Sequence, residues 1–422
     1  MIRRRDFLRS GAFAAVAASS SRARAALNSA AGPRVLIVGG GFAGAACALE
    51  LRRVNPAIDV ALVDPDARYL TCPLSNEAII GLRSLQSLTI ERDGLRRAGI
   101  RYIPDRAAAI DAESRNVRLQ SGGVLGYERL VVAPGIRLLW GTPEGYDEDS
   151  ALRMPHAWQA GAQTALLGKR LQAVPDGGTV AISVPAGLMR CPPGPYERAS
   201  LIAYWLKQHK PRSKLLILDS NNHFPRQDAF TAAWQELYPG VIEWIPVTQG
   251  GAVIRVDAKK LILYTSLGEH RVAVANVIPP QAPGQIALDA GLATGHGWCP
   301  IKPLSFESQL AQNVHVIGDA CIAGAMPKSA SAAVSQARQC GAAIAALLEG
   351  RAPAEPHFDS VCYSAIEPSS ALAIRGKFTV SDGDIRQIES PGATAADTSP
   401  SSANAREARD WYKRIRSASF GA

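Results

Sequence analysis

The chain has 422 residues, of which 47% are hydrophobic and 20% are charged. This length and apolar content suit two or three domains with buried cores, and they exclude a disordered or coiled-coil protein. The formal net charge is +9, but residues 1–25 hold six arginines and one aspartate, so the rest of the chain carries only +4. The basic balance gives little reason to expect a nucleic-acid partner.

The N-terminal segment has the pattern of a twin-arginine export signal. Arg4 and Arg5 precede a weakly apolar run over residues 11–18, and a small-x-small cleavage site ends at Ala25. The alternative is a disordered basic N-terminus. The pattern predicts a signal peptide over 1–25. Because the twin-arginine route exports folded proteins, it also predicts a mature protein that is folded before export and works in the periplasm. No later stretch reaches the roughly 18 apolar residues of a membrane span.

The hydrophobic pattern then predicts strands and helices in alternation, which is typical of an α/β protein. In a first unit, the predicted strands are 34–38, 60–63, 116–119 and 127–132, the last two flanking a turn at 121–123, and a helix covers 45–53. In a second unit, the strands 179–184 and 214–218 enclose a helix at 195–207. Residues 314–317 read as a further strand and 329–348 as an alanine-rich buried helix.

A glycine fingerprint lies between the first strand and the first helix. Gly39, Gly41 and Gly44 permit a tight turn and the approach of a pyrophosphate to the helix N-terminus. Asp64 follows Gly44 by 20 residues, at the end of the next strand, where it can accept a hydrogen bond from a ribose 2′-OH. The pattern predicts a dinucleotide site; a glycine-rich turn without a ligand is the alternative.

Two later segments favour FAD over NAD in this unit. Residues 127–135 (YERLVVAPG) and 315–320 (HVIGDA) resemble the later FAD-contact segments of the glutathione-reductase-like flavoproteins. The resemblance places Ala133, Gly135, Gly318 and Asp319 at the cofactor, with Asp319 at the ribityl chain. It implies two Rossmann-like domains and a C-terminal α+β interface domain. The predicted bounds are 33–150 with 285–350 for FAD binding, 151–284 for the second domain, and 357–422 for the interface domain.

The second unit has no nucleotide fingerprint after its first strand. Residues 185–194 contain three prolines and no GxGxxG spacing, so the turn lacks N–H donors for a phosphate. We therefore predict that NAD(P)H is not a substrate. Cys191 stands here before a helix and beside Arg190, a setting that favours a thiolate. A buried structural cysteine is the alternative.

Several cysteine-bearing segments resemble the flavoprotein subunit of flavocytochrome c sulfide dehydrogenase. The matching stretches are 69–76, 190–198, 297–300, 361–364 and the tail at 411–421. The resemblance implies that Cys72 carries FAD through a covalent thioether, and that Cys191 and Cys362 form a redox disulfide beside the flavin. It makes Glu197 a candidate acid/base, for which a surface charge on the following helix is the alternative.

The resemblance also implies the reaction. Sulfide is oxidised to polysulfide or elemental sulfur through the disulfide and FAD, and the electrons pass to a c-type cytochrome subunit. The chain has no CxxCH motif, so the haem c belongs to that partner. One alternative is a sulfide:quinone oxidoreductase, which needs a membrane-facing amphipathic segment, whereas residues 407–420 offer no long apolar face. The other is a non-catalytic partner that binds FAD or sulfur.

Four cysteines stay outside these roles, and the sequence contains no zinc-like cluster that would predict a metal. Cys47 and Cys340 lie in apolar helical sequence and read as packing residues. Cys321 follows Asp319 closely enough to lie near the flavin, and Cys299 has no clear role.

Overall fold

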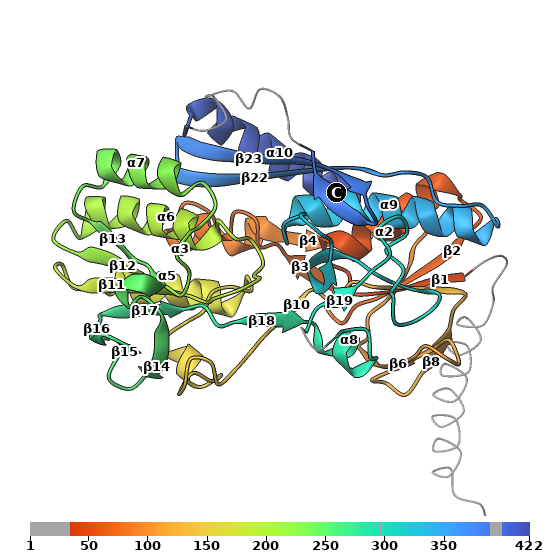
Figure 1. Ribbon diagram of the computed structural model, residues 1–422, viewed down its shortest axis with the longest axis horizontal. Coiled ribbons are helices and arrows are strands. Elements are labelled where there is room, and N and C mark those ends of the chain that lie inside the picture. Colours follow the sequence, from red (N-terminus) through yellow and green to blue (C-terminus); the bar gives the residue numbers. More distant parts are fainter. Residues whose placement is uncertain (1–33, 295–296, 389–398) are drawn as a thin grey trace, which may run out of the picture.

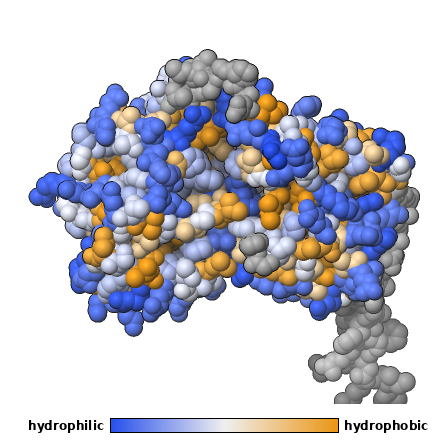
Figure 2. All heavy atoms as spheres, in the orientation of Figure 1, coloured by the Kyte–Doolittle hydropathy of each residue, from blue (hydrophilic) through white to orange (hydrophobic). Residues whose placement is uncertain are grey.

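A computed structural model describes residues 34–294, 297–388 and 399–422. The predicted export signal lies outside these residues. Figure 1 shows two α/β lobes side by side, with the C-terminal strands and helix lying across both. On the face in Figure 2, hydrophilic residues predominate at the outer edges, and hydrophobic residues form small groups rather than one continuous band.

The first lobe is built on a parallel sheet in the order β20-β9-β1-β2-β5. Its central strands are largely apolar and buried because helices and loops cover both faces, whereas the edge strand β5 is only half-buried. Helices α2 (Phe42–Val54) and α9 (Ala330–Leu348) pack against each other beside it. The strands are β1 (Arg34–Val38), β2 (Asp59–Val63), β5 (Arg101–Ile103), β9 (Arg129–Val132) and β20 (Val314–Val316).

The strand that directly follows the turn at 121–123 differs from the predicted one. The strand across the turn at 121–123 from β7 (Asn116–Leu119) is β8 (Val124–Gly126), in an antiparallel pair. Residues 127–132 contribute β9 instead, which joins the central sheet beside β1. The reason is burial: Leu130, Val131 and Val132 are all 0% exposed, and a peripheral hairpin could not cover both of their faces.

The second lobe repeats the plan with the parallel order β13-β12-β11-β17. The strands β11 and β12 and the helix between them confirm the prediction for this unit. The elements are α5 (Ala162–Gln172), β11 (Thr179–Val184), α6 (Gly194–His209), β12 (Lys214–Asp219), α7 (Gln227–Leu237), β13 (Ile242–Ile245) and β17 (Val274–Val277).

The C-terminal part contains β22 (His357–Glu367), β23 (Ser370–Ser381), β24 (Asp384–Gln387) and α10 (Ser402–Phe420). We expected no long apolar face in residues 407–420, and that expectation is wrong. Helix α10 buries Ala405, Ala408, Tyr412, Ile415 and Phe420, at helical spacing. This side packs inward, against α2 and β23.

The remaining strands and α-helices are short, and most of these strands form small separate sheets. They are β3 (Arg68–Leu70), α3 (Ser75–Ile79), β4 (Thr89–Glu91), α4 (Asp93–Arg97), β6 (Ala107–Asp111), β10 (Ile136–Leu138), β14 (Val253–Asp257), β15 (Ile262–Thr265), β16 (Gly268–Arg271), β18 (Gln281–Pro283), α8 (Gln285–Asp289), β19 (Cys299–Pro300) and β21 (Cys321–Ile322).

Candidate active site

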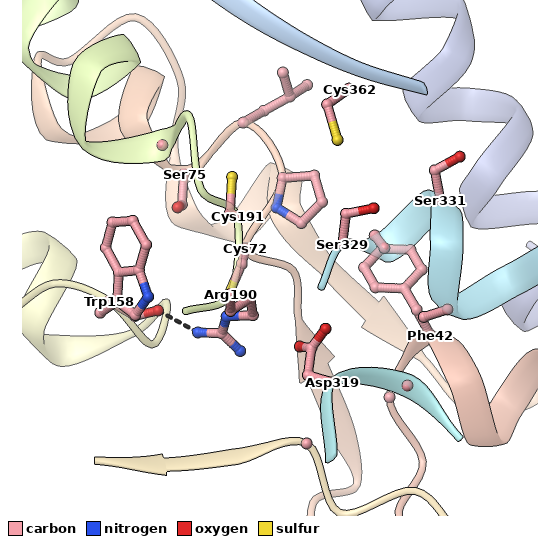
Figure 3. A pocket seen from close by; sticks show the side chains of 18 of the residues that line it. Phe42, Cys72, Ser75, Trp158, Arg190, Cys191, Asp319, Ser329, Ser331 and Cys362 are labelled. Atoms are coloured by element: carbon pink, nitrogen blue, oxygen red, sulfur yellow. Dashed lines mark hydrogen bonds between the residues drawn. The ribbon is translucent and has the colours of Figure 1, made fainter. Parts of the chain in front are cut away.

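A pocket lies where the two lobes and the C-terminal sheet meet. Its walls come from the β1–α2 turn, the segment before α3, the turn before α6, the start of α9 and β22 (Figure 3). Segments far apart in the sequence therefore converge on one space. The lining residues that carry chemistry are Gly41, Cys72, Asn76, Arg190, Cys191, Glu197, Arg198, Asp319 and Cys362.

Of the glycine fingerprint, Gly41 lines this pocket, whereas Gly39, Gly44 and Asp64 are not among its lining residues. A Cβ on Gly39 would lie 2.2 Å from the Ala133 carbonyl oxygen, and one on Gly44 would lie 1.9 Å from the Gly39 carbonyl oxygen. Only glycine fits at these two positions, because the opposing atoms are backbone. A Cβ on Gly41 would meet no protein atom closer than 3.5 Å, so space stays open there for a ligand.

Asp64 lies beside the fingerprint and holds it in place. Its carboxylate accepts hydrogen bonds from Gly40 N (2.6 Å), Asp66 N (3.0 Å) and Arg92 Nη2 (2.9 Å). These use three of about four acceptor sites of a carboxylate, which leaves one for a ribose hydroxyl. The sequence analysis missed Arg92, which is buried and also donates to the Gly40 carbonyl oxygen. An isolated arginine in a loop gave no signal of this role.

Asp319 supplies a test of whether a flavin nucleotide fits. Its side chain lines the pocket, and its Oδ1 is buried without a hydrogen-bond partner among the described residues. A buried carboxylate oxygen of this kind needs a donor, and a ribityl hydroxyl is one. Ala133, Gly135 and Gly318 line the same pocket. Six of the predicted cofactor residues therefore line one space, namely Gly41, Cys72, Ala133, Gly135, Gly318 and Asp319, and this lining fits FAD.

Three cysteines line the pocket. Cys72 precedes α3, Cys191 precedes α6, and Cys362 lies on β22. All seven cysteines of the chain are unbonded in this structure, so Cys191 and Cys362 are present as thiols rather than as the implied disulfide. Figure 3 shows the sulfurs of Cys191 and Cys362 projecting into the same space from opposite walls.

The backbone at Cys191 is in a conformation that is uncommon for a non-glycine residue. Its φ is +53°, and its N–H donates to the Lys328 carbonyl oxygen at 2.7 Å. Left-handed backbone of this kind costs on the order of 1 kcal/mol and clusters at functional sites. The Lys328 contact ties the turn before α6 to the segment that precedes α9.

The expectation that Cys191 favours the thiolate is wrong for this form. Burial raises the pKa of Cys191 well above its usual range, and nearby Cys362 and Glu197 raise it further, against the opposing effect of Arg190. Burial likewise raises the pKa of Cys362 to about 11. Loss of hydration outweighs the helix terminus and the adjacent arginine, so both sulfurs are held as neutral thiols.

Glu197 faces the pocket rather than the surrounding solvent. Its exposed fraction is 8%, which rules out the surface-charge alternative. Burial raises the pKa of Glu197 to about 7, against the hydrogen bond that Asn76 Nδ2 donates at 3.2 Å. A carboxyl group that titrates near neutral pH is suited to accepting and returning a proton.

Arg198 is a site residue that the sequence analysis missed. It is 2% exposed, and its guanidinium donates to Asn76 Oδ1 (3.0 Å), Asn276 Oδ1 (2.8 Å) and the His156 carbonyl oxygen (3.0 Å). An arginine beside a glutamate on a helix usually indicates a solvated face. Its partners come from distant segments, so no local pattern could have identified them.

The other four cysteines do not line this pocket. Cys47 and Cys340 are both 0% exposed on α2 and α9, in agreement with the packing role. Cys299 and Cys321 face each other across the β19–β21 pair, and burial raises the pKa of each to about 12. Cys321 lies near Asp319 in sequence, but its sulfur is in the core.

A Rossmann-type sheet with this fingerprint, a second such unit and a pocket that fits a flavin define a flavin-dependent disulfide-type oxidoreductase. The profile of the pyridine nucleotide-disulphide oxidoreductases matches residues 33–159. The solved structure of the sulfide:quinone oxidoreductase from Aquifex aeolicus has a TM-score of 0.73 at 18% identity, with 93% of each chain covered. Putidaredoxin reductase in its putidaredoxin complex gives 0.63 at 18%, covering 83% of this chain and 81% of that one. At these identities the likeness concerns the fold.

The chain belongs to the family of flavocytochrome c sulfide dehydrogenase flavoprotein chains. The profile of the central part of that chain matches residues 164–279, and the profile of its flavin-binding part matches 354–420. The flavoprotein chain from Chlorobaculum thiosulfatiphilum is 54% identical over 43 residues, which cover 10% of this chain and 90% of that sequence.

Sulfide:quinone oxidoreductases are also relatives of this chain. The mitochondrial one of Mus musculus is 23% identical over 319 residues, covering 72% of this chain and 68% of that one. The sulfide-quinone reductase of Aquifex aeolicus is 29% identical over 185 residues, covering 43% and 41%. The protein is therefore an FAD-binding oxidoreductase of the sulfide-oxidising flavoproteins.

Proposed function

We propose that this protein oxidises sulfide at a Cys191–Cys362 pair, and that its FAD is joined covalently to Cys72 and is reoxidised by a c-type cytochrome subunit. The observation that carries the proposal is the convergence of these three sulfurs on one pocket with Glu197 and the unpartnered Asp319. In the proposed cycle, the pair alternates between a disulfide and a dithiol.

The proposed reaction at the cysteine pair conserves atoms and electrons. Hydrosulfide attacks one sulfur of the disulfide; the bond between the cysteines breaks, leaving a persulfide on one and a thiolate on the other. A second hydrosulfide attacks the outer sulfur of the persulfide and releases HSS⁻, while one proton passes to Glu197. The two cysteine sulfurs then re-form their bond and lose two electrons. Bound FAD supplies the acceptor for an electron pair and can return electrons singly.

The cytochrome acceptor is proposed from family membership and from the C-terminal helix. A quinone acceptor is the second candidate, because quinone-reducing relatives share the fold. None of the helices in the described ranges is long and apolar enough to span a bilayer. The apolar side of α10 packs on the protein, so it is not available to a membrane surface. This packing favours the cytochrome.

NAD(P)H is not proposed as an electron donor. The turn between β11 and α6 contains Pro185, Pro192 and Pro193, and α6 begins only at Gly194. Prolines offer no N–H groups to a phosphate at this place.

We propose the periplasm as the compartment, on the basis of the twin-arginine pattern. Replacing Arg4 and Arg5 with lysine should hold the protein in the cytoplasm.

Stopped-flow measurement of flavin reduction by sulfide tests the proposed pair. Cys191→Ser and Cys362→Ser should each give a folded yellow protein that sulfide no longer reduces rapidly, with rates normalised to bound FAD. Cys340→Ser is the matched control, because that sulfur lies outside the pocket, and it should keep the wild-type rate. Wild-type rates in both pocket variants would defeat the mechanism. Absence of turnover in the wild type with sulfide and cytochrome would favour a non-catalytic role.

A further inference from the structure

The side-chain partner of Glu197 is a neutral amide, not a cation. Asn76 Nδ2 donates to Glu197 Oε2 at 3.2 Å and lies 3.4 Å from the Gly194 carbonyl oxygen. The neighbouring Arg198 turns its guanidinium away, toward Asn76, Asn276 and the backbone of residues 156–157. The Glu197 carboxyl group is thus buried with a hydrogen-bond donor in place of an ion pair.

The direction of the Asn76 amide is fixed by Arg198. Arg198 Nε donates to Asn76 Oδ1 at 3.0 Å, and a guanidinium can only donate. The amide oxygen must therefore face Arg198, and the NH₂ group must face Glu197. Arg198 is itself fixed, because Asn276 Oδ1 accepts from it at 2.8 Å while Asn276 Nδ2 donates to the Pro155 and His156 carbonyl oxygens at 2.7 and 2.8 Å.

The fixed orientation has an electrostatic consequence. A donor aimed at a carboxyl group favours its ionised form, whereas burial favours the neutral form. The titratable and charged groups near Glu197 are Glu77 on α3, Arg198 on α6, Cys191 and Cys362. Glu77 is paired with Arg83 at 2.9 Å. The backbone N–H of Ala365, on β22, also faces the Glu197 carboxyl group.

We propose that Asn76 is a positioning residue for sulfide oxidation: held by Arg198, its amide keeps the Glu197 carboxyl group directed into the pocket and favours its ionised form. The inference rests on the proposed role of Glu197 as the proton acceptor. In this proposal, the contact between Arg198 and Asn76 sets the pH at which Glu197 accepts a proton. Without the amide donor, only the Ala365 N–H and the charge of Arg198 oppose the effect of burial on Glu197.

The test is the pH dependence of flavin reduction by sulfide in the holoenzyme with Asn76→Leu. The midpoint assigned to Glu197, near 7 in the wild type, should rise by one unit or more, which is about tenfold in proton affinity. At pH 7 the rate should fall about fivefold, because the ionised fraction drops from about one half to about one tenth. At high pH the rate should recover.

A second measurement does not depend on activity. The infrared band of a protonated carboxyl group, identified by its loss in Glu197→Gln, should titrate with a higher midpoint in Asn76→Leu. Should that variant fail to fold, the isosteric Asn76→Asp should shift the midpoint in the same direction, since it sets a second carboxylate beside Glu197. Asn221→Leu is the matched control, because Asn221 lies outside the pocket and should leave the profile unchanged.

The outcomes separate this inference from the proposed function. Asn76→Leu could lower the rate equally at every pH and leave the midpoints of the pH–rate profile and of the infrared titration unchanged. In that case Asn76 has only a structural role and the inference fails. If Glu197→Gln keeps the wild-type rate and pH profile, the proposed role of Glu197 fails, and the inference falls with it.

Discussion

Glu197 is a buried carboxyl group whose titration is coupled to the stability of the fold. Its pKa is about 7 in the folded protein, against an ordinary value of 4.5, because burial disfavours the charged form. The folded state therefore holds the proton more tightly than the unfolded state. The protonated Glu197 carboxyl group contributes about 3 kcal/mol to the free energy of unfolding. This contribution is fully present below about pH 4.5 and is lost as the pH rises through about 7.

Replacement of Glu197 by glutamine should remove this loss. The free energy of unfolding of Glu197→Gln should fall less than that of the wild type between pH 5 and pH 8, by up to about 3 kcal/mol. Denaturant unfolding at a series of pH values measures the difference. Glu128→Gln, at an exposed position, is the control and should follow the wild-type curve. Parallel curves for all three proteins would show that Glu197 is not protonated in the fold.

Cys72 is the residue at which covalent attachment can be tested directly. Its sulfur lines the pocket that contains Asp319, so it is within the space that the cofactor residues enclose. Denatured wild-type protein should retain yellow flavin, and Cys72→Ser should release it on denaturation. Mass spectrometry of the denatured chain gives the same answer independently. Cys362→Ser should retain the bound flavin, and recovery of free FAD from fully loaded wild type would exclude the thioether.

At the scale of elements, α10 connects the C-terminus to the cofactor segment. The Tyr412 hydroxyl lies 2.6 Å from Thr71 Oγ1, in the residue before Cys72, and both side chains are buried. The Phe420 ring stacks on Tyr69 with centroids 5.3 Å apart. The helix therefore holds the Cys72 segment from behind, and its apolar side is occupied in doing so.

A double-mutant cycle tests this connection. Tyr412→Phe removes a hydroxyl and leaves the buried Thr71 hydroxyl with only its 3.5 Å contact to the Pro73 carbonyl oxygen, which should cost about 1 kcal/mol of stability. Thr71→Val alone should cost a similar amount, whereas the double variant should lose about 1 kcal/mol less than the sum. Denaturant unfolding of the four proteins measures the coupling. Strict additivity would mean that the two hydroxyl groups do not stabilise each other.

The elements that the sequence predicted well are those with strong local signals. Strand β11 (Thr179–Val184) has the predicted bounds, and α2 and α6 extend the predicted helices by one to three residues at each end. The hairpin at 116–126 was mispaired because two apolar runs follow its turn, and periodicity does not say which of them pairs. The contact between Asn76 and Glu197 spans 121 residues, so only the fold creates it.

In the site, too, local motifs predicted some features, whereas others depend on contacts that only the fold creates. Cys72, Cys191 and Cys362 were proposed from motifs, and the structure brings all three to one pocket. Their thiol pKa values depend on burial, which no motif encodes, and the prediction of a thiolate at Cys191 failed for that reason. The positions of functional side chains were thus predictable from resemblance, whereas their electrostatics depended on packing between lobes.

At the scale of the whole molecule, the site is shared among all three parts of the chain. The first lobe contributes Gly41 and Asp319, the second lobe contributes Cys191 and Glu197, and the C-terminal sheet contributes Cys362. Substrate chemistry therefore requires the lobes and the C-terminal sheet to be assembled together. An electron acceptor, by contrast, can dock outside the pocket, so its nature depends on the outer surface.

The last prediction concerns that acceptor. The apolar side of α10 packs against α2 and β23, and the proposed electron acceptor is a soluble cytochrome rather than a membrane quinone. Protein reduced anaerobically by sulfide should pass its electrons to a c-type cytochrome rapidly, and to a short-chain ubiquinone only slowly. Stopped-flow absorbance measures both, and salt should slow the cytochrome reaction if charged surfaces guide docking. Cys191→Ser reduced with dithionite instead of sulfide is the matched control, because it should still reduce the cytochrome. Faster oxidation by the quinone would reverse the assignment and place the protein with the sulfide:quinone oxidoreductases in its reaction.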